Sequence, residues 1–136
     1  MCIRDRGSNE FVVSLDIPKP AARSADAYLR FIPRTEMDIA VVGAGAALTL
    51  DPDGTCTAAR LALGAVAPTA RLVPAAAEAV IGNKIDDTAL ANVAIAARAA
   101  CNPIDDKRGT VALRVHVAGV LATRAVKIAI ERLESR

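Results

Sequence analysis

Aromatic residues are scarce in this chain of 136 residues. It has no tryptophan, one tyrosine and two phenylalanines, together 2% of the sequence. All three, Phe11, Tyr28 and Phe31, fall in the first quarter of the chain. The remainder must therefore pack its core from Ala, Val, Leu and Ile, and it offers no row of aromatic rings on which nucleic-acid bases would stack.

An excess of charge of one sign is also lacking. The 17 basic and 15 acidic residues are interspersed along the chain, and the net charge is only +2. No polybasic stripe is available to follow a phosphate backbone. Without such a stripe or a stacking platform, the sequence argues against a nucleic-acid partner.

Cysteine and histidine are too few and too scattered to build a metal site. Cys2, Cys56 and Cys101 are odd in number, and no two have the spacing of a redox or metal motif. His116 is the only histidine, and within an expected helix we interpret it as a surface or boundary residue. Unpaired cysteines and the lack of a signal peptide fit a reducing cytoplasm.

Long apolar runs are the last absence. Charged residues interrupt every candidate before it reaches the roughly 18 residues of a membrane-spanning helix. The interrupting residues are Asp38, Asp51, Arg60, Arg71 and Glu78. The sequence therefore predicts no membrane span.

The apolar content that is present suffices for one globular domain, because 53% of the residues are hydrophobic and 24% are charged. Alternation with a period of two predicts strands in the first half of the chain. We expect them over residues 11–17, 27–33, 39–50 and 55–66, with a loop over 21–26, a tight turn over 51–54 and one more short strand over 68–72.

The pattern then changes to a helical period. We expect a short helix over residues 75–81 ended by Gly82, a second from Asp86 or Asp87 to about Ala100, and a long terminal helix capped by Thr110. For the terminal helix we predict a buried stripe of Leu113, Val117, Val120, Leu121, Ala125 and Ile128, with Arg114, Lys127, Glu131 and Arg132 facing outward. Strands followed by helices predict an α+β fold: a small antiparallel sheet of three to four strands followed by three helices packed on one face.

Two glycines, Gly43 and Gly45, follow the apolar start of a strand and resemble a dinucleotide-binding loop. Leu48, however, stands where that fingerprint needs Gly or Ala for close helix packing. The turn over residues 51–54 also leaves no room for a phosphate-binding helix. We therefore interpret the glycines as part of a sheet strand that lets a helix or a neighbouring chain approach closely.

Paired carboxylates occur twice, at Asp86-Asp87 and at Asp105-Asp106, each time just before a helix. Negative charge there stabilises exposed helix amides, so we expect capping and loop pairing from both pairs. Arg30 and Arg34 have a better claim to function. On an edge strand they would either meet an anionic ligand or act as solvated charges that prevent sheet aggregation, and the residues alone leave both open.

Three segments resemble a known family. Residues 27–42, 61–69 and 103–110, which include the motifs YLRFIPRTEMDIAVV and PIDDKRGT, are similar to the C-terminal domain of the FAD-binding medium subunit of molybdenum hydroxylases. That family includes carbon monoxide dehydrogenase and xanthine dehydrogenase. The resemblance covers about residues 10–136 and implies the same α+β fold. Residues 1–9 look like translated adaptor sequence, so we expect a non-native leader there and a missing N-terminal FAD-binding domain upstream.

The resemblance also implies a function. The parent subunit would relay electrons from iron-sulfur clusters through FAD to an acceptor, as part of an FAD-dependent oxidoreductase. Molybdopterin would sit in a large partner subunit and 2Fe-2S clusters in a small one. FAD would be held mostly by the missing domain. Family members carry a basic residue at the position of Arg30, near the flavin ring, so Arg30 and Arg34 are the candidate cofactor-binding residues; no catalytic residue is assigned, and the fragment alone is expected to be inactive.

Two other interpretations stay open. In one, the chain is a stand-alone α+β interaction or assembly module without flavin, whose Ala- and Gly-rich strand mediates association. In the other, it is a small dinucleotide-binding protein that uses Gly43 and Gly45.

Overall fold

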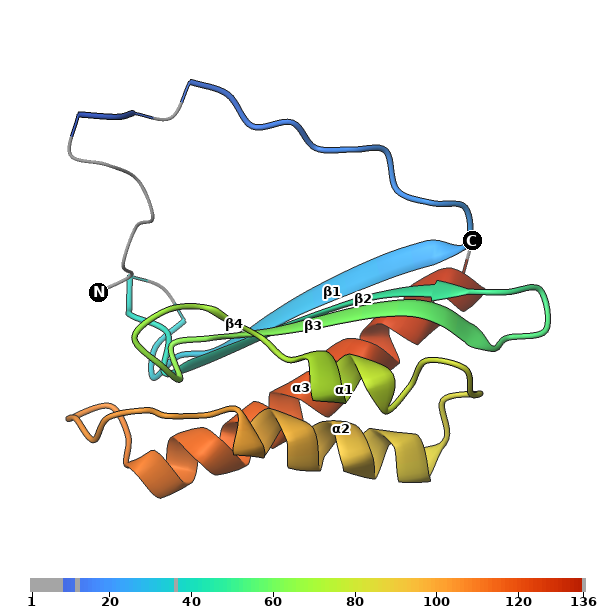
Figure 1. The fold of residues 1–136 in the computed structure, drawn as a ribbon. Helices are drawn as coiled ribbons and strands as arrows, with labels where there is room; N and C mark the ends of the chain where they lie inside the picture. Colours follow the sequence, from blue (N-terminus) through green and yellow to red (C-terminus); the bar gives the residue numbers. More distant parts are fainter. Residues whose placement is uncertain (1–8, 12, 36, 136) are drawn as a thin grey trace.

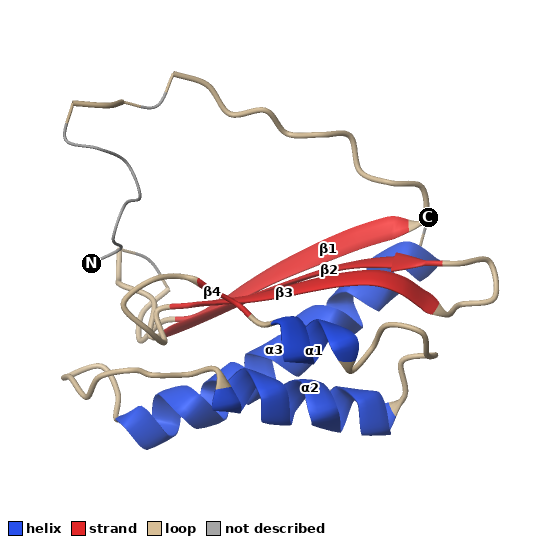
Figure 2. Ribbon diagram, in the orientation of Figure 1, coloured by secondary structure: helices blue, strands red, loops and turns tan. Residues whose placement is uncertain are grey.

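The protein is described here by a computed structural model, which places residues 9–11, 13–35 and 37–135. Within these residues four strands form one antiparallel sheet in the order β1-β2-β3-β4, and three helices follow. The elements are β1 (Ser24–Phe31), β2 (Val42–Leu50), β3 (Cys56–Gly64), β4 (Arg71–Leu72), α1 (Pro74–Glu78), α2 (Asp87–Ala99) and α3 (Val111–Glu134). All three helices lie on one side of the sheet (Figures 1 and 2), which confirms the predicted α+β fold.

Alternation along the strands gives the sheet two different faces. In β1 the side chains of Ala25 and Ala27 are buried, whereas those of Asp26, Tyr28 and Arg30 are exposed. The buried face packs on the helices and meets a core made of alanine, valine and leucine, together with Cys56. All three aromatic side chains keep substantial exposure, so the expectation that the core would contain small aliphatic residues is confirmed.

The β2-β3 hairpin closes at the predicted turn. Gly54 has a φ of 84°, a conformation that glycine adopts at no steric cost. The Asp51 carboxylate accepts hydrogen bonds from the amides of Asp53 and Thr55, at 3.0 and 2.8 Å. A side chain that bonds its own turn is the usual reason for aspartate at such a position.

Side-chain caps begin the two long helices. Asp86 Oδ1 accepts from the amide of Ala89 at 2.8 Å and so caps α2, and Thr110 Oγ1 accepts from Leu113 at 3.2 Å and caps α3. Both predicted starts are confirmed. The short helix α1 ends at Glu78, earlier than the predicted Ile81, and the chain continues as turns to Gly82, whose φ is 80°.

Two strand predictions need correction. The described residues of 11–17 form no strand, because no described segment pairs with them; Val12 lies outside the described residues. The predicted loop over 21–26 is wrong in part, since β1 already begins at Ser24, opposite Thr49 of β2. β2 begins at Val42 rather than Ile39, because the chain first forms a loop in which Met37 has a φ of 51°.

The predicted polar face of α3 is wrong at one position. Arg114 was expected to face outward, yet it is only 4% exposed, while Leu113 of the predicted apolar stripe is 40% exposed. The reason is that backbone carbonyls at the ends of two strands accept hydrogen bonds from the guanidinium of Arg114. Residues 1–8 of the predicted leader lie outside the described residues. Among the helices that the structure describes, none has the length and apolar character needed to cross a membrane.

Candidate functional site

The side of the sheet away from the helices carries the candidate cofactor-binding residue Arg30. We call this side the open face and define it by the outward side chains of Tyr28 and Arg30 in β1 and by Gly43, Gly45, Ala62 and Gly64 of β2 and β3. Strand register places Arg30 opposite Gly43 and Tyr28 opposite Gly45. A guanidinium and an aromatic ring thus stand beside each other over a floor that has almost no side chains.

Tyr28 lies across the two glycines of β2. A Cβ atom added to Gly43 would be 2.6 Å from the Tyr28 hydroxyl oxygen, and one added to Gly45 would be 3.6 Å from Cδ2 of the ring. Within the described chain the close neighbour of these glycines is therefore the tyrosine ring and not a helix, which was one of the two approaching groups that we expected. The ring still keeps 65% of its surface exposed.

Arg30 and Arg34 have different surroundings. Arg30 is exposed on the open face, and its guanidinium has no hydrogen bond or ion pair with any described residue. Arg34 lies in the loop after β1, where its Nε is 3.3 Å from Asp38 Oδ2 and its Nη2 donates to the carbonyl oxygen of Met37 at 3.3 Å. No described contact joins the two arginines. Arg30 therefore differs from Arg34 in having no polar contact with a described residue.

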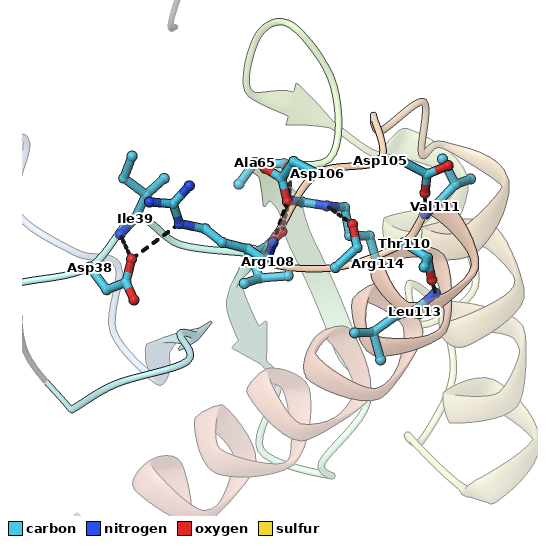
Figure 3. Close-up of polar contacts among 12 residues, drawn as sticks. Asp38, Ile39, Ala65, Asp105, Asp106, Arg108, Thr110, Val111, Leu113 and Arg114 are labelled. Carbon is cyan, nitrogen blue, oxygen red and sulfur yellow. Dashed lines mark hydrogen bonds and ion pairs between the residues drawn. The ribbon is translucent and has the colours of Figure 1, made fainter.

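Asp38 holds the loop that carries Arg34, and sequence reasoning did not identify it as a site residue. Its side chain is 7% exposed, and it accepts hydrogen bonds from the amide of Ile39 at 2.7 Å and from Arg108 Nε at 3.2 Å (Figure 3). The Ile39 amide and then the Arg108 guanidinium lower the pKa of this carboxyl below its ordinary value. Arg108 is 70 residues away in the sequence, so no local pattern signals the pairing.

Arg114 ties the start of α3 to the same end of the sheet. Its Nη1 donates to the carbonyl oxygens of Val41 at 2.7 Å and Ala65 at 3.4 Å, and its Nη2 lies 2.7 Å from Asp106 Oδ1 (Figure 3). The amide of Arg108 and then the Arg114 guanidinium lower the pKa of Asp106.

The two carboxylates of the second pair, Asp105 and Asp106, have the kinds of partner that we expected. Asp105 accepts from the amide of Val111 in the first turn of α3, and Asp106 pairs with Arg114. The predicted capping and loop pairing are therefore confirmed for this pair. Together with Asp38, these contacts join the described residues of the loop between β1 and β2 to the connector over residues 102–110, next to the end of β1 that bears Arg30.

The other reactive groups give no sign of a catalytic centre. Burial raises the pKa of the Cys56 and Cys101 thiols, which disfavours the nucleophilic thiolate. His116 is exposed on α3, as predicted. In the described part of the chain no group of three or more His, Cys, Asp or Glu residues is placed to hold a metal ion. Among the described residues, the open face offers a cation and an aromatic ring for binding.

A family model described as the CO dehydrogenase flavoprotein C-terminal domain matches residues 27–129 of the chain. Among curated proteins, the carbon monoxide dehydrogenase medium chain of Afipia carboxidovorans is 31% identical over 126 residues, which are 93% of this chain and 43% of that protein. The chain therefore spans less than half the length of this relative.

Two solved structures also contain chains that match this one. A carbon monoxide dehydrogenase from Hydrogenophaga pseudoflava, which lacks the Mo-pyranopterin moiety of its molybdenum cofactor, contains a chain that matches with a TM-score of 0.80 and 34% identity, over 85% of this chain and 40% of that one. Quinoline 2-oxidoreductase from Pseudomonas putida 86 matches with a TM-score of 0.78 and 32% identity, over 86% of this chain and 40% of that one.

Proposed function

Because the chain belongs to the family of CO dehydrogenase flavoprotein C-terminal domains, we propose that it is the C-terminal lobe of the flavin subunit of a molybdenum hydroxylase. In this proposal the open face lines the flavin, which a preceding N-terminal lobe of the same subunit holds. When bound, FAD supplies the electron-accepting group between iron-sulfur clusters and a final acceptor. The 2Fe-2S clusters would lie in a small partner subunit and molybdopterin in a large one. The enzyme would be cytoplasmic, and residues 1–9 of this chain would be a non-native leader.

The observation that carries the proposal is the state of Arg30. A guanidinium that is exposed and has no polar contact with a described residue has hydrogen-bond donors to offer a ligand. It stands on the open face beside Gly43, Gly45 and Gly64, where Tyr28 lies over the first two glycines and a Cβ added to Gly64 would meet nothing within 4 Å. These residues fit one wall of a flavin site, while the opposite wall would belong to the N-terminal lobe.

Each residue then has a physical task. Arg30 places positive charge where the reduced flavin gains negative charge, which favours reduction and orients the carbonyl edge of the ring system. Tyr28 covers part of the floor and keeps water from that side. Arg34 contributes its charge at longer range, since Asp38 already holds its guanidinium in the loop.

The test uses the full-length subunit, expressed from the gene with its upstream reading frame and reconstituted with FAD. We expect a yellow protein, and we expect Arg30→Ala to weaken FAD binding by roughly 10- to 100-fold, since a hydrogen bond to a charged group contributes about 1.5–3 kcal/mol. A shift of the flavin potential toward more negative values should accompany it. Arg30→Lys should recover part of both effects.

Arg60→Ala provides the matched control, because Arg60 is an exposed arginine on the same side of the sheet, opposite Ala47 of β2 and four residues along β3 from Gly64, which shares the register row of Arg30. Its replacement should change neither the affinity nor the potential. Equal FAD affinity and potential in the Arg30→Ala and original subunits would remove Arg30 from the site. A full-length subunit that takes up no FAD and sediments as a defined homo-oligomer would favour the stand-alone assembly module instead.

A further inference from the structure

The segment before β1 has the pattern of a strand but no strand partner in this domain. Apart from Val12, its apolar residues alternate with polar ones, so that in an extended chain the other four share one face. These residues are Phe11, Val13, Leu15 and Ile17, and their exposures are 79%, 84%, 84% and 90%. By contrast, Ala25 and Ala27 on the apolar face of β1 are 8% and 4% exposed. Exposed apolar faces of this kind mark surfaces that another polypeptide covers.

The extents of the two sequence comparisons place this segment between domains. The likeness to the medium chain takes in 126 of the 136 residues, and any unbroken stretch of that length includes residues 11–17. The match to the family's C-terminal domain begins only at residue 27. The segment therefore lies inside the stretch that is similar to the medium chain and before the part that matches the C-terminal domain. The relative is more than twice as long as this chain, so it has further polypeptide to cover the segment.

No described strand of this domain pairs with the described residues of the segment. The helices cover the inner face of the sheet, and the chain before β1 runs on the opposite side, away from the strands (Figure 1). Pro18 and Pro20 separate the segment from β1; each fixes φ and lacks an amide hydrogen, so this stretch acts as a stiff extended spacer. A tight reversal that would pair residues 11–17 with β1 is disfavoured for this reason.

We propose that residues 10–17 form a strand of the lobe that precedes this domain in the medium subunit, with Phe11, Val13, Leu15 and Ile17 packed into the core of that lobe. Residues 18–20 are then the connection between the two lobes. The inference rests on the proposed function, because it takes the longer flavin subunit as the native protein. It adds an interaction surface outside the open face and the flavin site.

Hydrogen exchange of residues 10–17 tests the inference, measured in the full-length subunit and in the 136-residue chain. We expect the amides of the non-proline residues to exchange on the order of 100-fold more slowly in the full-length subunit, since paired strand amides exchange only through local opening. In the 136-residue chain they should exchange at the rate of an unstructured peptide. Equal rates in the two proteins would overturn the inference, whether both are fast or both are slow.

Two adjacent substitutions provide a sharper comparison. Leu15→Asp places a charge on the apolar face, and Ser14→Asp places the same charge on the polar face one residue away. In the full-length subunit, Leu15→Asp should abolish the slow exchange and Ser14→Asp should leave it. In the 136-residue chain neither should change the unfolding midpoint, because Leu15 is 84% exposed there. Equal effects of the two substitutions on the slow exchange would contradict the strand.

The FAD absorbance of the same full-length samples separates this inference from the proposed function. Bound FAD together with fast exchange over residues 10–17 would overturn the strand and leave the flavin role standing. Slow exchange without FAD would support the strand and contradict the flavin role. Slow exchange that appears only at high concentration of the 136-residue chain would assign the segment to contacts between copies and overturn the inference.

Discussion

The guanidinium of Arg114 donates a hydrogen bond to the carbonyl oxygen of Val41, 73 residues away in the sequence, over 2.7 Å. Val41 immediately precedes β2, two residues before Gly43, which lies opposite Arg30. A second bond from the same nitrogen reaches Ala65, just after β3. The first turn of α3 therefore fixes the end of the sheet on which the open face and its arginine depend.

Replacing Arg114 with methionine should destabilise the domain strongly. The substitution keeps much of the side-chain volume but leaves the buried carbonyl of Val41 and the carboxylate of Asp106 without their partner. We expect the free energy of unfolding to fall by about 2–4 kcal/mol. Urea unfolding followed by far-UV circular dichroism measures it. Arg124→Met, at an exposed position of the same helix, should change stability by less than about 0.5 kcal/mol.

Local features of the fold were predictable from the sequence, and Thr110 shows why. A hydroxyl that bonds an amide three residues later depends only on neighbouring residues, as does the Asp51 carboxylate in its turn. The change from a period of two to a helical period likewise reports which face each element buries. These signals were enough for the α+β fold, the order of strands and helices, and the start of α3.

The errors concern residues whose environment is set far along the chain. Arg114 was predicted to be exposed because nothing nearby in sequence reveals the carbonyls of Val41 and Ala65 that bind it. Asp38 was missed for the same reason, since Arg108 lies in a distant connector. The prediction of a strand over residues 11–17 was wrong for a different reason. Its pattern is typical of a strand, but alternation does not say which polypeptide supplies the neighbouring strand.

Asp38→Asn should reduce stability at neutral pH and have little effect in acid. The folded state lowers the pKa of Asp38, so this carboxylate contributes stability above its ordinary pKa of about 3.9, and the contribution is lost as pH falls through the lower folded value. The variant has no carboxylate at this position, so it lacks this contribution to stability at every pH. The difference in urea midpoint between the two proteins should therefore be largest near neutral pH and shrink below about pH 4. A difference that is constant with pH would contradict the role of the ionised carboxylate.

Gly119→Ala should weaken the contact between α2 and α3. An added Cβ would lie 2.6 Å from Arg98 Nε and 3.1 Å from the carbonyl oxygen of Ala94. Alanine gains about 1 kcal/mol in helix propensity over glycine, but overpacking costs about 1–3 kcal/mol, so we expect a net loss of about 1 kcal/mol. Repeating the substitution in an Arg98→Ala background should reduce the loss without abolishing it, because the Ala94 backbone cannot move aside. Unchanged or raised stability in urea unfolding would show that the helices separate freely.

Tyr28 makes the open face directly observable, because it is the only tyrosine and the chain has no tryptophan. Gly43→Ala should change its emission intensity and near-UV circular dichroism, since the new Cβ would lie 2.6 Å from the present hydroxyl position and force the ring to shift. Gly64→Ala is the matched control on the same face: its Cβ would meet nothing within 4 Å. A Tyr28 signal that responds equally to both substitutions would contradict the placement of the ring over Gly43.

The same signal reports on the flavin when the full-length subunit is used. A flavin lying on the glycine floor would be in contact with Tyr28 and should quench its emission strongly on FAD addition, because the phenol ring and the bound ring system would then share one surface. Other tyrosines of the longer subunit must be accounted for, so the measurement is the difference between that subunit and its Tyr28→Phe variant. Gly43→Ala should displace the Tyr28 ring and so weaken both this quenching and FAD binding. Gly64→Leu should weaken FAD binding by placing a side chain on the glycine floor, without moving Tyr28. If FAD binds equally well to both glycine variants, the flavin does not rest on the open face, even if the subunit holds it elsewhere.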